Sequence, residues 1–195
     1  MTAPSTATPS TATHVPGEDG VWVLILGDMV MFAFVFAVYL ADRAKDADLY
    51  RRSQATLDRN LGALNTLLLL TSSLLVAHAV RRMRDGTRRR AELLIGGALL
   101  CALGFVGVKV VEYHDKLHAG LRPSTNGFFT FYYVLTGLHL FHVLLGIGVL
   151  LFLLVQARRT VPAGPRLAWV EGGACFWHMV DLLWIMLFPL LYLVR

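Results

Sequence analysis

The chain has 195 residues, of which 56% are hydrophobic and 16% are charged. Soluble domains average about 45–50% apolar residues, and the apolar residues here fall in long runs, so a water-soluble domain is excluded. The net charge of +5 would suit nucleic-acid binding, but the basic residues lie in short segments between the apolar runs, where membrane topology explains them better.

The chain opens on a segment, residues 1–20, that is rich in Thr, Ala, Pro and Ser and has no Lys or Arg. This composition predicts a disordered N-terminal tail and fits neither a signal peptide nor a transit peptide. Five apolar runs follow, each long enough to cross a bilayer as a helix of about 20 residues. They predict one all-α transmembrane domain over 21–195, with helices at about 21–41, 61–80, 91–112, 127–155 and 172–194.

The first predicted helix carries a single acidic residue, Asp28, in ILGDMVMFAF. It lies about 10 Å along the helix and has no cation beside it on the same helix. A carboxyl group at this depth must be neutral, paired across helices or hydrated. Two interpretations stay open, namely a proton-handling site and a structural hydrogen bond to His78 of the second helix or to His178 of the fifth.

The third predicted helix carries Lys109 and Glu112, three residues apart on one face near its far end. This spacing predicts an ion pair between them. The same helix contains Cys101, and the last helix contains Cys175. Both are expected to be small buried thiols, because the sequence has neither a disulfide framework nor a Cys-x-x-Cys metal motif.

The fourth and fifth predicted helices carry two polar pairs. His139 and His142 in TGLHLFHVLLG share one helical face, as do His178 and Asp181 in WHMVDLLW. No Glu-x-x-His pair or His-Glu-x-x-His motif indicates a metal, although metal or haem ligation and proton handling stay open. Cross-helix hydrogen bonding is favoured. It would make a polar seam of His78, His139, His142, His178 and Asp181.

The segment WHMVDLLW also shows a stripe at helical spacing, formed by Trp177, Asp181 and Trp184. The opposite orientation would expose Asp181 to lipid. The stripe is therefore expected to face the interior of the bundle.

An odd number of helices places the two termini on opposite sides of the membrane. Nine lysines and arginines fall on the N-terminal side and eight on the other, so the totals do not decide the orientation. The densest short loop is RRMRDGTRRR (81–90), and short loops carry the positive-inside signal best. We therefore predict a cytoplasmic N-terminus and an outside C-terminus.

Four segments, in order, resemble the subunit III family of the haem–copper respiratory oxidases, cytochrome c oxidase subunit III. EGGACFWHMVDLLWIMLF (171–188) is similar to the family's Glu followed by a Trp-His-x-Val-Asp-x-x-Trp helix, and TGLHLFHVLLG (136–146) to its Thr-Gly-x-His-x-x-His-Val-x-x-Gly. VVEYHD (110–115) resembles its Glu-Tyr helix end. LNTLLLLTSSLLVAHAVRRMRDGTRRR (64–90) resembles its Leu-Asn-Thr helix before a basic loop. The resemblance covers about residues 20–195.

The resemblance implies a bundle that lacks the first two helices of the seven-helix form and lies in a bacterial inner membrane. It implies an accessory, non-redox subunit that docks on the catalytic subunit I, with haem and copper in the partner subunits and no cofactor bound directly. It also implies a phospholipid in a cleft between helix groups, whose residues the sequence does not indicate, and support of proton uptake and turnover stability. Asp28 is the candidate residue for the proton-related role.

Three departures from the family pattern indicate a divergent branch. Asp28 stands where the family usually has Glu, Lys109 stands where it usually has Gln, and the segment 42–60 is charged where the family is often Pro-rich. One branch accompanies nitric oxide reductase, which stays open as an alternative partner. A rival of another class is a self-contained membrane redox enzyme that uses His139, His142, His178 and Asp28 as ligands.

Overall fold

The computed structural model describes residues 19–159 and 165–194, and within these ranges all regular secondary structure is helical. Five helices are long and apolar enough to cross a membrane, which confirms the predicted fold class. They are α1 (Asp19–Lys45), α3 (Arg59–Arg84), α4 (Arg88–His118), α5 (Gly127–Arg158) and α6 (Pro165–Phe188). The short α2 (Ala47–Gln54) and the π-helical turn η1 (Pro189–Leu193) complete the chain order.

The long helices extend beyond the apolar runs that predict them. α1 begins at Asp19, so residues 19 and 20 are helical and not part of a tail, while the rest of the predicted tail, 1–18, lies outside the described residues. Polar side chains cap the starts of three helices. Asp46 accepts from Leu49 N at the start of α2, Asp58 from Asn60 N at the start of α3, and Asn126 from Phe129 N at the start of α5. These caps satisfy backbone donors that a helix start leaves open.

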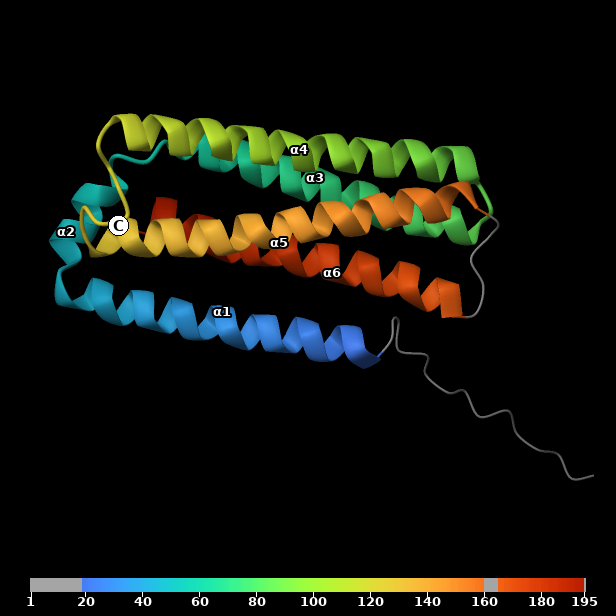
Figure 1. The fold of residues 1–195 in the computed structure, drawn as a ribbon, viewed down its shortest axis with the longest axis horizontal. Helices are drawn as coiled ribbons and strands as arrows, with labels where there is room; N and C mark the ends of the chain where they lie inside the picture. The colour runs from blue at the N-terminus through green and yellow to red at the C-terminus, as the bar shows by residue number, and fades with distance from the viewer. Residues whose placement is uncertain (1–18, 160–164, 195) are drawn as a thin grey trace, which may run out of the picture.

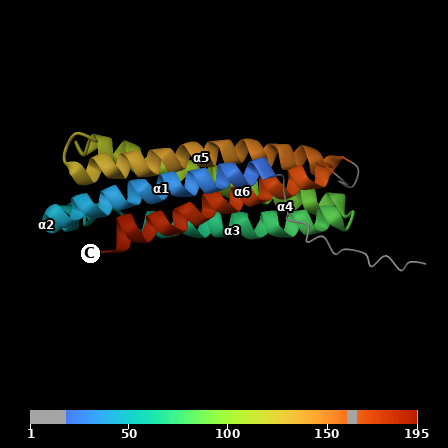
Figure 2. The same ribbon diagram turned by 90° about the horizontal axis from the view of Figure 1, so that it is seen from below.

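Four of the long helices form a closed ring, in which α3 packs on α4, α4 on α5, α5 on α6 and α6 on α3. α1 lies outside the ring along the seam between α5 and α6, as the two views show (Figures 1 and 2). The start of α1 and the C-terminus lie at opposite ends of the bundle (Figure 1). Because α1 has neighbours on one side only, it is the least buried of the five spans.

The helix α2 was not expected, because its eight residues are too polar to give a hydropathy signal. It lies at the same end of the bundle as the C-terminus and packs against α1 and α5 (Figure 1). The Tyr50 hydroxyl donates to Asp42 Oδ2 at 2.8 Å. Burial, reinforced by this carboxylate, raises the pKa of the Tyr50 hydroxyl above its usual range. The bond fixes α2 to the end of α1.

The fifth span is a single helix in the sequence prediction but changes geometry at Pro189 in the structure. A proline has no N–H to donate and its ring clashes with the preceding turn, so regular α-helix ends at Phe188. The wider turn η1 follows and turns Tyr192 into the bundle, where its side chain is buried.

Candidate functional site

Asp28 of α1 contacts α5, and its partner is His142. The distance from Asp28 Oδ2 to His142 Nε2 is 3.4 Å. The partners named for a structural hydrogen bond, His178 and His78, are not the ones found. His178 Nδ1 lies 2.6 Å from Ser73 Oγ of α3, and His78 belongs to α3, whereas α1 packs on α5 and α6. The Asp28 side chain is 23% exposed and the His142 side chain is 6% exposed, so the pair sits at the edge of the interior.

The surroundings of His142 determine which of its ring nitrogens faces Asp28. Its Nδ1 lies 2.8 Å from the backbone carbonyl of Leu138, and a carbonyl oxygen only accepts, so Nδ1 carries a hydrogen. Nε2 therefore faces the Asp28 carboxyl group, and the two form an ion pair when Nε2 also carries a hydrogen. Rings of Phe32 and Phe141 pack on the imidazole.

The other histidines of the predicted polar seam have three different environments. His178 Nδ1 lies 2.6 Å from Ser73 Oγ, which links α6 to α3 as expected. His139 is fully buried between Phe105 and Trp184, and neither of its ring nitrogens has a hydrogen-bond partner within the described residues, contrary to expectation. His78 is exposed on the outer face of α3 and does not belong to the interior seam.

Lys109 and Glu112 form the ion pair expected from their spacing, with 2.8 Å between Lys109 Nζ and Glu112 Oε2. The sequence did not indicate their third member. Lys109 Nζ also donates to the Tyr192 hydroxyl at 2.9 Å, and that hydroxyl donates to Glu112 Oε1 at 2.5 Å. All three side chains are buried. Trp184 and Tyr132 rings surround the ammonium group, at 4.8 and 5.5 Å from Nζ to the ring centroids.

Each side chain of this triad forms a hydrogen bond with both of the others. The triad links α4 to η1 and so fixes the C-terminal turn to the ring of helices. A buried ion pair is weak evidence for stability by itself, but it determines which partners must meet. We therefore assign the Lys109–Glu112–Tyr192 triad a structural role.

A second ion pair, not predicted from the sequence, joins the C-terminal end of α3 to the N-terminal part of α6. Arg84 Nη2 lies 2.5 Å from Glu171 Oε1, and the Glu171 side chain is buried. Glu171 heads the strongest family motif, but its partner lies 87 residues away in the basic loop region. Only the ring arrangement of α3 beside α6 brings the two together.

The stripe of Trp177, Asp181 and Trp184 faces the interior, as predicted. Asp181 is buried, and its Oδ1 has no hydrogen-bond partner within the described residues. Trp184 Nε1 donates to Thr66 Oγ1 of α3 at 3.0 Å. Trp177 packs on Gly146 of α5, where an added Cβ would lie 2.6 Å from two ring atoms. The glycine that ends the motif TGLHLFHVLLG therefore makes room for the tryptophan.

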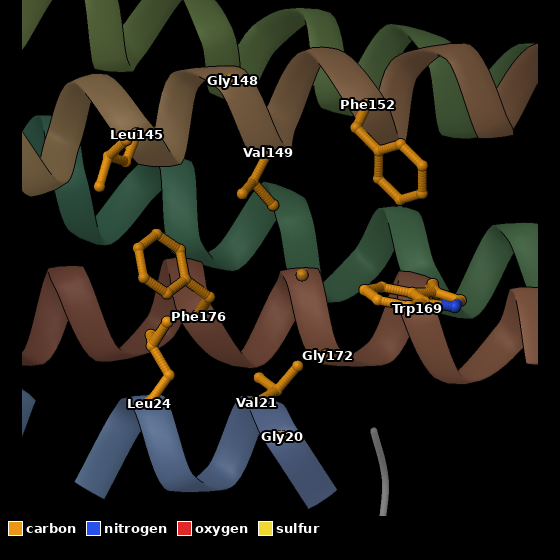
Figure 3. A pocket seen from close by; sticks show the side chains of 11 residues that line it. Gly20, Val21, Leu24, Leu145, Gly148, Val149, Phe152, Trp169, Gly172 and Phe176 are labelled. Atoms are coloured by element: carbon orange, nitrogen blue, oxygen red, sulfur yellow. The ribbon is translucent and has the colours of Figure 1, made fainter. Parts of the chain in front are cut away.

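An apolar groove with a cavity volume of about 640 Å³ opens where α1 leans on α5 and α6. Figure 3 shows the side chains that approach one another across it, which include Val21, Leu24, Val149, Phe152, Trp169 and Phe176. Two glycines of α6, Gly172 and Gly173, line the groove. They allow close packing there, because a Cβ on Gly172 would lie 3.1 Å from Val21. An apolar groove open on one side of a membrane helix suits an acyl chain.

The residues proposed as ligands for a metal or haem are not brought together. In the part of the chain that the structure describes, no three His, Cys, Asp or Glu side chains gather closely enough to hold a metal ion. Asp28 and His142 meet, while His139 is enclosed by rings and His178 contacts α3. The two cysteines are free and half-buried, which is less burial than expected. These residues therefore do not fit a metal or haem site.

Comparison with known proteins supplies the family. The chain matches the family model described as cytochrome c oxidase subunit III over residues 18–194. It is 30% identical to the cytochrome c oxidase subunit 3 of Bacillus sp. (strain PS3), covering 90% of this chain and 84% of that protein. It is 29% identical to the quinol oxidase subunit 3 of Bacillus subtilis (strain 168), covering 90% of this chain and 85% of that protein.

A third relative is a fused protein, the heme-copper oxidase subunit I+III of Aeropyrum pernix. It is 30% identical over 187 residues, which are 91% of this chain and 22% of the fused protein. The family match runs through all five long helices, and its range includes the residues of the Asp28–His142 pair, the triad and the Trp177 stripe. The chain therefore belongs to the cytochrome c oxidase subunit III family.

Proposed function

We propose that this chain is an accessory, non-redox membrane subunit of a respiratory haem–copper oxidase complex. The observation that carries the proposal is the match to subunit III over nearly the whole chain, on a bundle of five membrane-spanning helices. Haem and copper would reside in the partner subunits and supply the oxygen and electron chemistry there. This chain's own residues would support assembly, lipid binding and proton uptake.

The catalytic subunit I is the proposed partner. The fused subunit I+III of Aeropyrum pernix supports this proposal, because one polypeptide there carries both names. The oxidase names of the relatives favour an oxygen-reducing complex over nitric oxide reductase. The self-contained redox enzyme is not favoured, because its ligands are not brought together among the described residues.

The apolar groove of α1, α5 and α6 is the proposed phospholipid site. Its lining is almost entirely apolar, and Trp169 lies at its end near the start of α6, where amphipathic rings meet headgroups. Leu24 and Phe176 approach each other across it (Figure 3). An acyl chain there would fill the space between α1 and the ring.

The Asp28–His142 pair is the proposed proton-handling group. The geometry supports this role, because a carboxyl group and an imidazole face each other at 3.4 Å and the Asp28 side chain is 23% exposed. The proposed location is a bacterial inner membrane, with the N-terminus in the cytoplasm.

Purification of the native complex through a tag on this chain tests the proposal. We expect a haem-bearing catalytic subunit and phospholipid to copurify, and we expect the chain separated from its partners to show no Soret band. A Soret band or stoichiometric iron in the separated chain would overturn the proposal. Recovery of nitric oxide reductase as the partner would correct it.

A further inference from the structure

A second hollow lies on the outer face of the α3–α4 pair, away from the apolar groove of α1, α5 and α6. Its volume is about 340 Å³, and its lining is His78, Arg82, Arg90, Leu93 and Leu94. Three of these five side chains are basic or can become so, and no carboxylate lines the hollow. We propose that this hollow binds the phosphate headgroup of an anionic phospholipid, a site separate from the groove proposed above.

The charges in the hollow are poorly compensated within the chain. Arg82 is paired only with Asp85, at 3.7 Å between Nη1 and Oδ2, and both side chains are largely exposed. Arg90 and His78 have no ion-pair partner among the described residues. Cations that converge at the edge of a bilayer attract an anion, because solvent screening is weaker there than in bulk water. A lipid phosphate is the anion at that depth.

The order of residues along the helices matches the order of groups in a lipid. Arg82 and Arg90 lie within about 3 Å of the helix ends at Arg84 and Arg88, at 1.5 Å per residue. Leu93 lies about one turn deeper and is 71% exposed. Leu100, two turns further on α4, and Leu74 of α3 are also exposed. A phosphate between the arginines would thus continue into acyl chains along leucines.

The hollow does not lead into the bundle, because the helices close together beyond it. Ser72 Oγ donates to the backbone carbonyl of Ala98 at 3.0 Å, directly linking α3 and α4. A Cβ on Gly97 would lie 3.2 Å from Leu75 Cδ1, so the helices approach closely there. A bound molecule must therefore stay on the outer face. This suits a lipid and does not suit an ion on its way to the interior.

The test measures lipid retention by the purified native complex reconstituted in phosphatidylcholine vesicles with and without phosphatidylglycerol. After return to detergent, native mass spectrometry counts the phosphatidylglycerol retained. The test variant is Arg82→Gln with Arg90→Gln. The matched control, Arg88→Gln with Arg89→Gln, removes the same charge from the same end, but its side chains do not line the hollow.

The wild type and the control are expected to retain phosphatidylglycerol in preference to phosphatidylcholine. The test variant should bind it about 25-fold more weakly, from about fivefold for each arginine at the membrane surface. Leu93→Trp, which keeps the charges and fills the hollow, should also weaken retention. A photoreactive phosphatidylglycerol should label the 88–100 segment in the wild type and not in the test variant.

Four results would overturn the inference. They are equal retention by test variant and control, equal retention of the two lipids, full displacement by inorganic phosphate with no dependence on the acyl chain, and loss of the catalytic subunit from the test variant while lipid retention is unchanged. The last would identify the hollow as a protein-docking surface. Because every arm compares variants of one assembled complex, failure here leaves the proposed function standing.

Discussion

At the scale of single residues, two pairs of ionisable side chains within the bundle differ in how far they are exposed. The Lys109–Glu112 pair is buried, and Tyr192 hydrogen-bonds to both of its members. The Asp28–His142 pair is partly exposed, with 23% of the Asp28 side chain accessible. The enclosed pair holds helices together, and the partly exposed pair is the one for which we propose proton exchange.

Replacing Asp28 by Ala is expected to leave assembly intact, because interhelical polar contacts in membranes are worth about 0.6 kcal/mol on average. The variant lacks the carboxyl group for which we propose proton exchange, so proton uptake or the number of turnovers before inactivation should fall. Stopped-flow proton uptake and activity over many turnovers measure this. Glu92→Gln, which alters a more exposed carboxylate 3.8 Å from Arg158, is the control. Unchanged kinetics in Asp28→Ala would leave Asp28 a structural role only.

Replacing Lys109 by Met is expected to destabilise the protein by about 3–5 kcal/mol, because Glu112 would be left buried without its cation. The double variant with Glu112→Gln should recover much of this loss, since no unpaired charge remains. Denaturant unfolding of the purified subunit measures both. The exposed Arg158–Glu92 ion pair offers a matched comparison, because Arg158→Met should lower the free energy of unfolding by less than about 1 kcal/mol. Equal losses in the single and double variants would contradict the argument.

At the scale of elements, close approach between helices depends on small residues placed opposite large rings. α5 and α6 meet where Gly146 accepts the Trp177 ring, and α3 meets the end of α6 where Gly62 faces Phe188. In a membrane, helix association relies on such packing, because lipid tails are as apolar as the helices. Gly146 of α5 and Gly62 of α3 are therefore packing positions.

Gly146→Ala should push α5 and α6 apart, since its Cβ would lie 2.6 Å from the Trp177 ring. Overpacking of this kind costs about 1–3 kcal/mol. The thermal midpoint of the detergent-solubilised protein should fall accordingly. Gly148→Ala, on the same helix with nothing within 4 Å of the added Cβ, should leave the midpoint unchanged or slightly higher. A midpoint for Gly146→Ala equal to that of Gly148→Ala would show that the contact is easily relaxed.

At the scale of the whole molecule, one ring of four helices carries a fifth helix on its outside, and the start of α1 and the turn η1 lie at opposite ends of the bundle (Figure 1). The peripheral position of α1 creates both the apolar groove and the partly exposed Asp28–His142 pair. These two proposed functional features therefore depend on how α1 packs on α5 and α6, whereas the hollow on α3 and α4 does not.

Reporter fusions test the predicted orientation of the molecule. Alkaline phosphatase fused after the C-terminus should be active, because that end is predicted to face outside. The same reporter placed in the 85–87 turn between α3 and α4 should be inactive, and a green fluorescent protein fused there should fluoresce. The physical reason is the positive-inside rule acting on the six arginines of 81–90. The reverse pattern of reporter activity would show that the topology is inverted, with the 81–90 loop outside and the C-terminus in the cytoplasm.

The sequence by itself determined the five spans, the i, i+3 ion pair and the inward stripe of α6, because all three depend on local quantities: hydropathy, helical spacing and the cost of exposing charge to lipid. It also carried the motifs that identify the family. The tertiary structure alone decided that Asp28 meets His142, that Tyr192 completes the Lys109–Glu112 triad, and that Arg84 reaches Glu171. These contacts join residues 80 or more positions apart, so they depend on which helices are neighbours, and helical spacing contains no information on that.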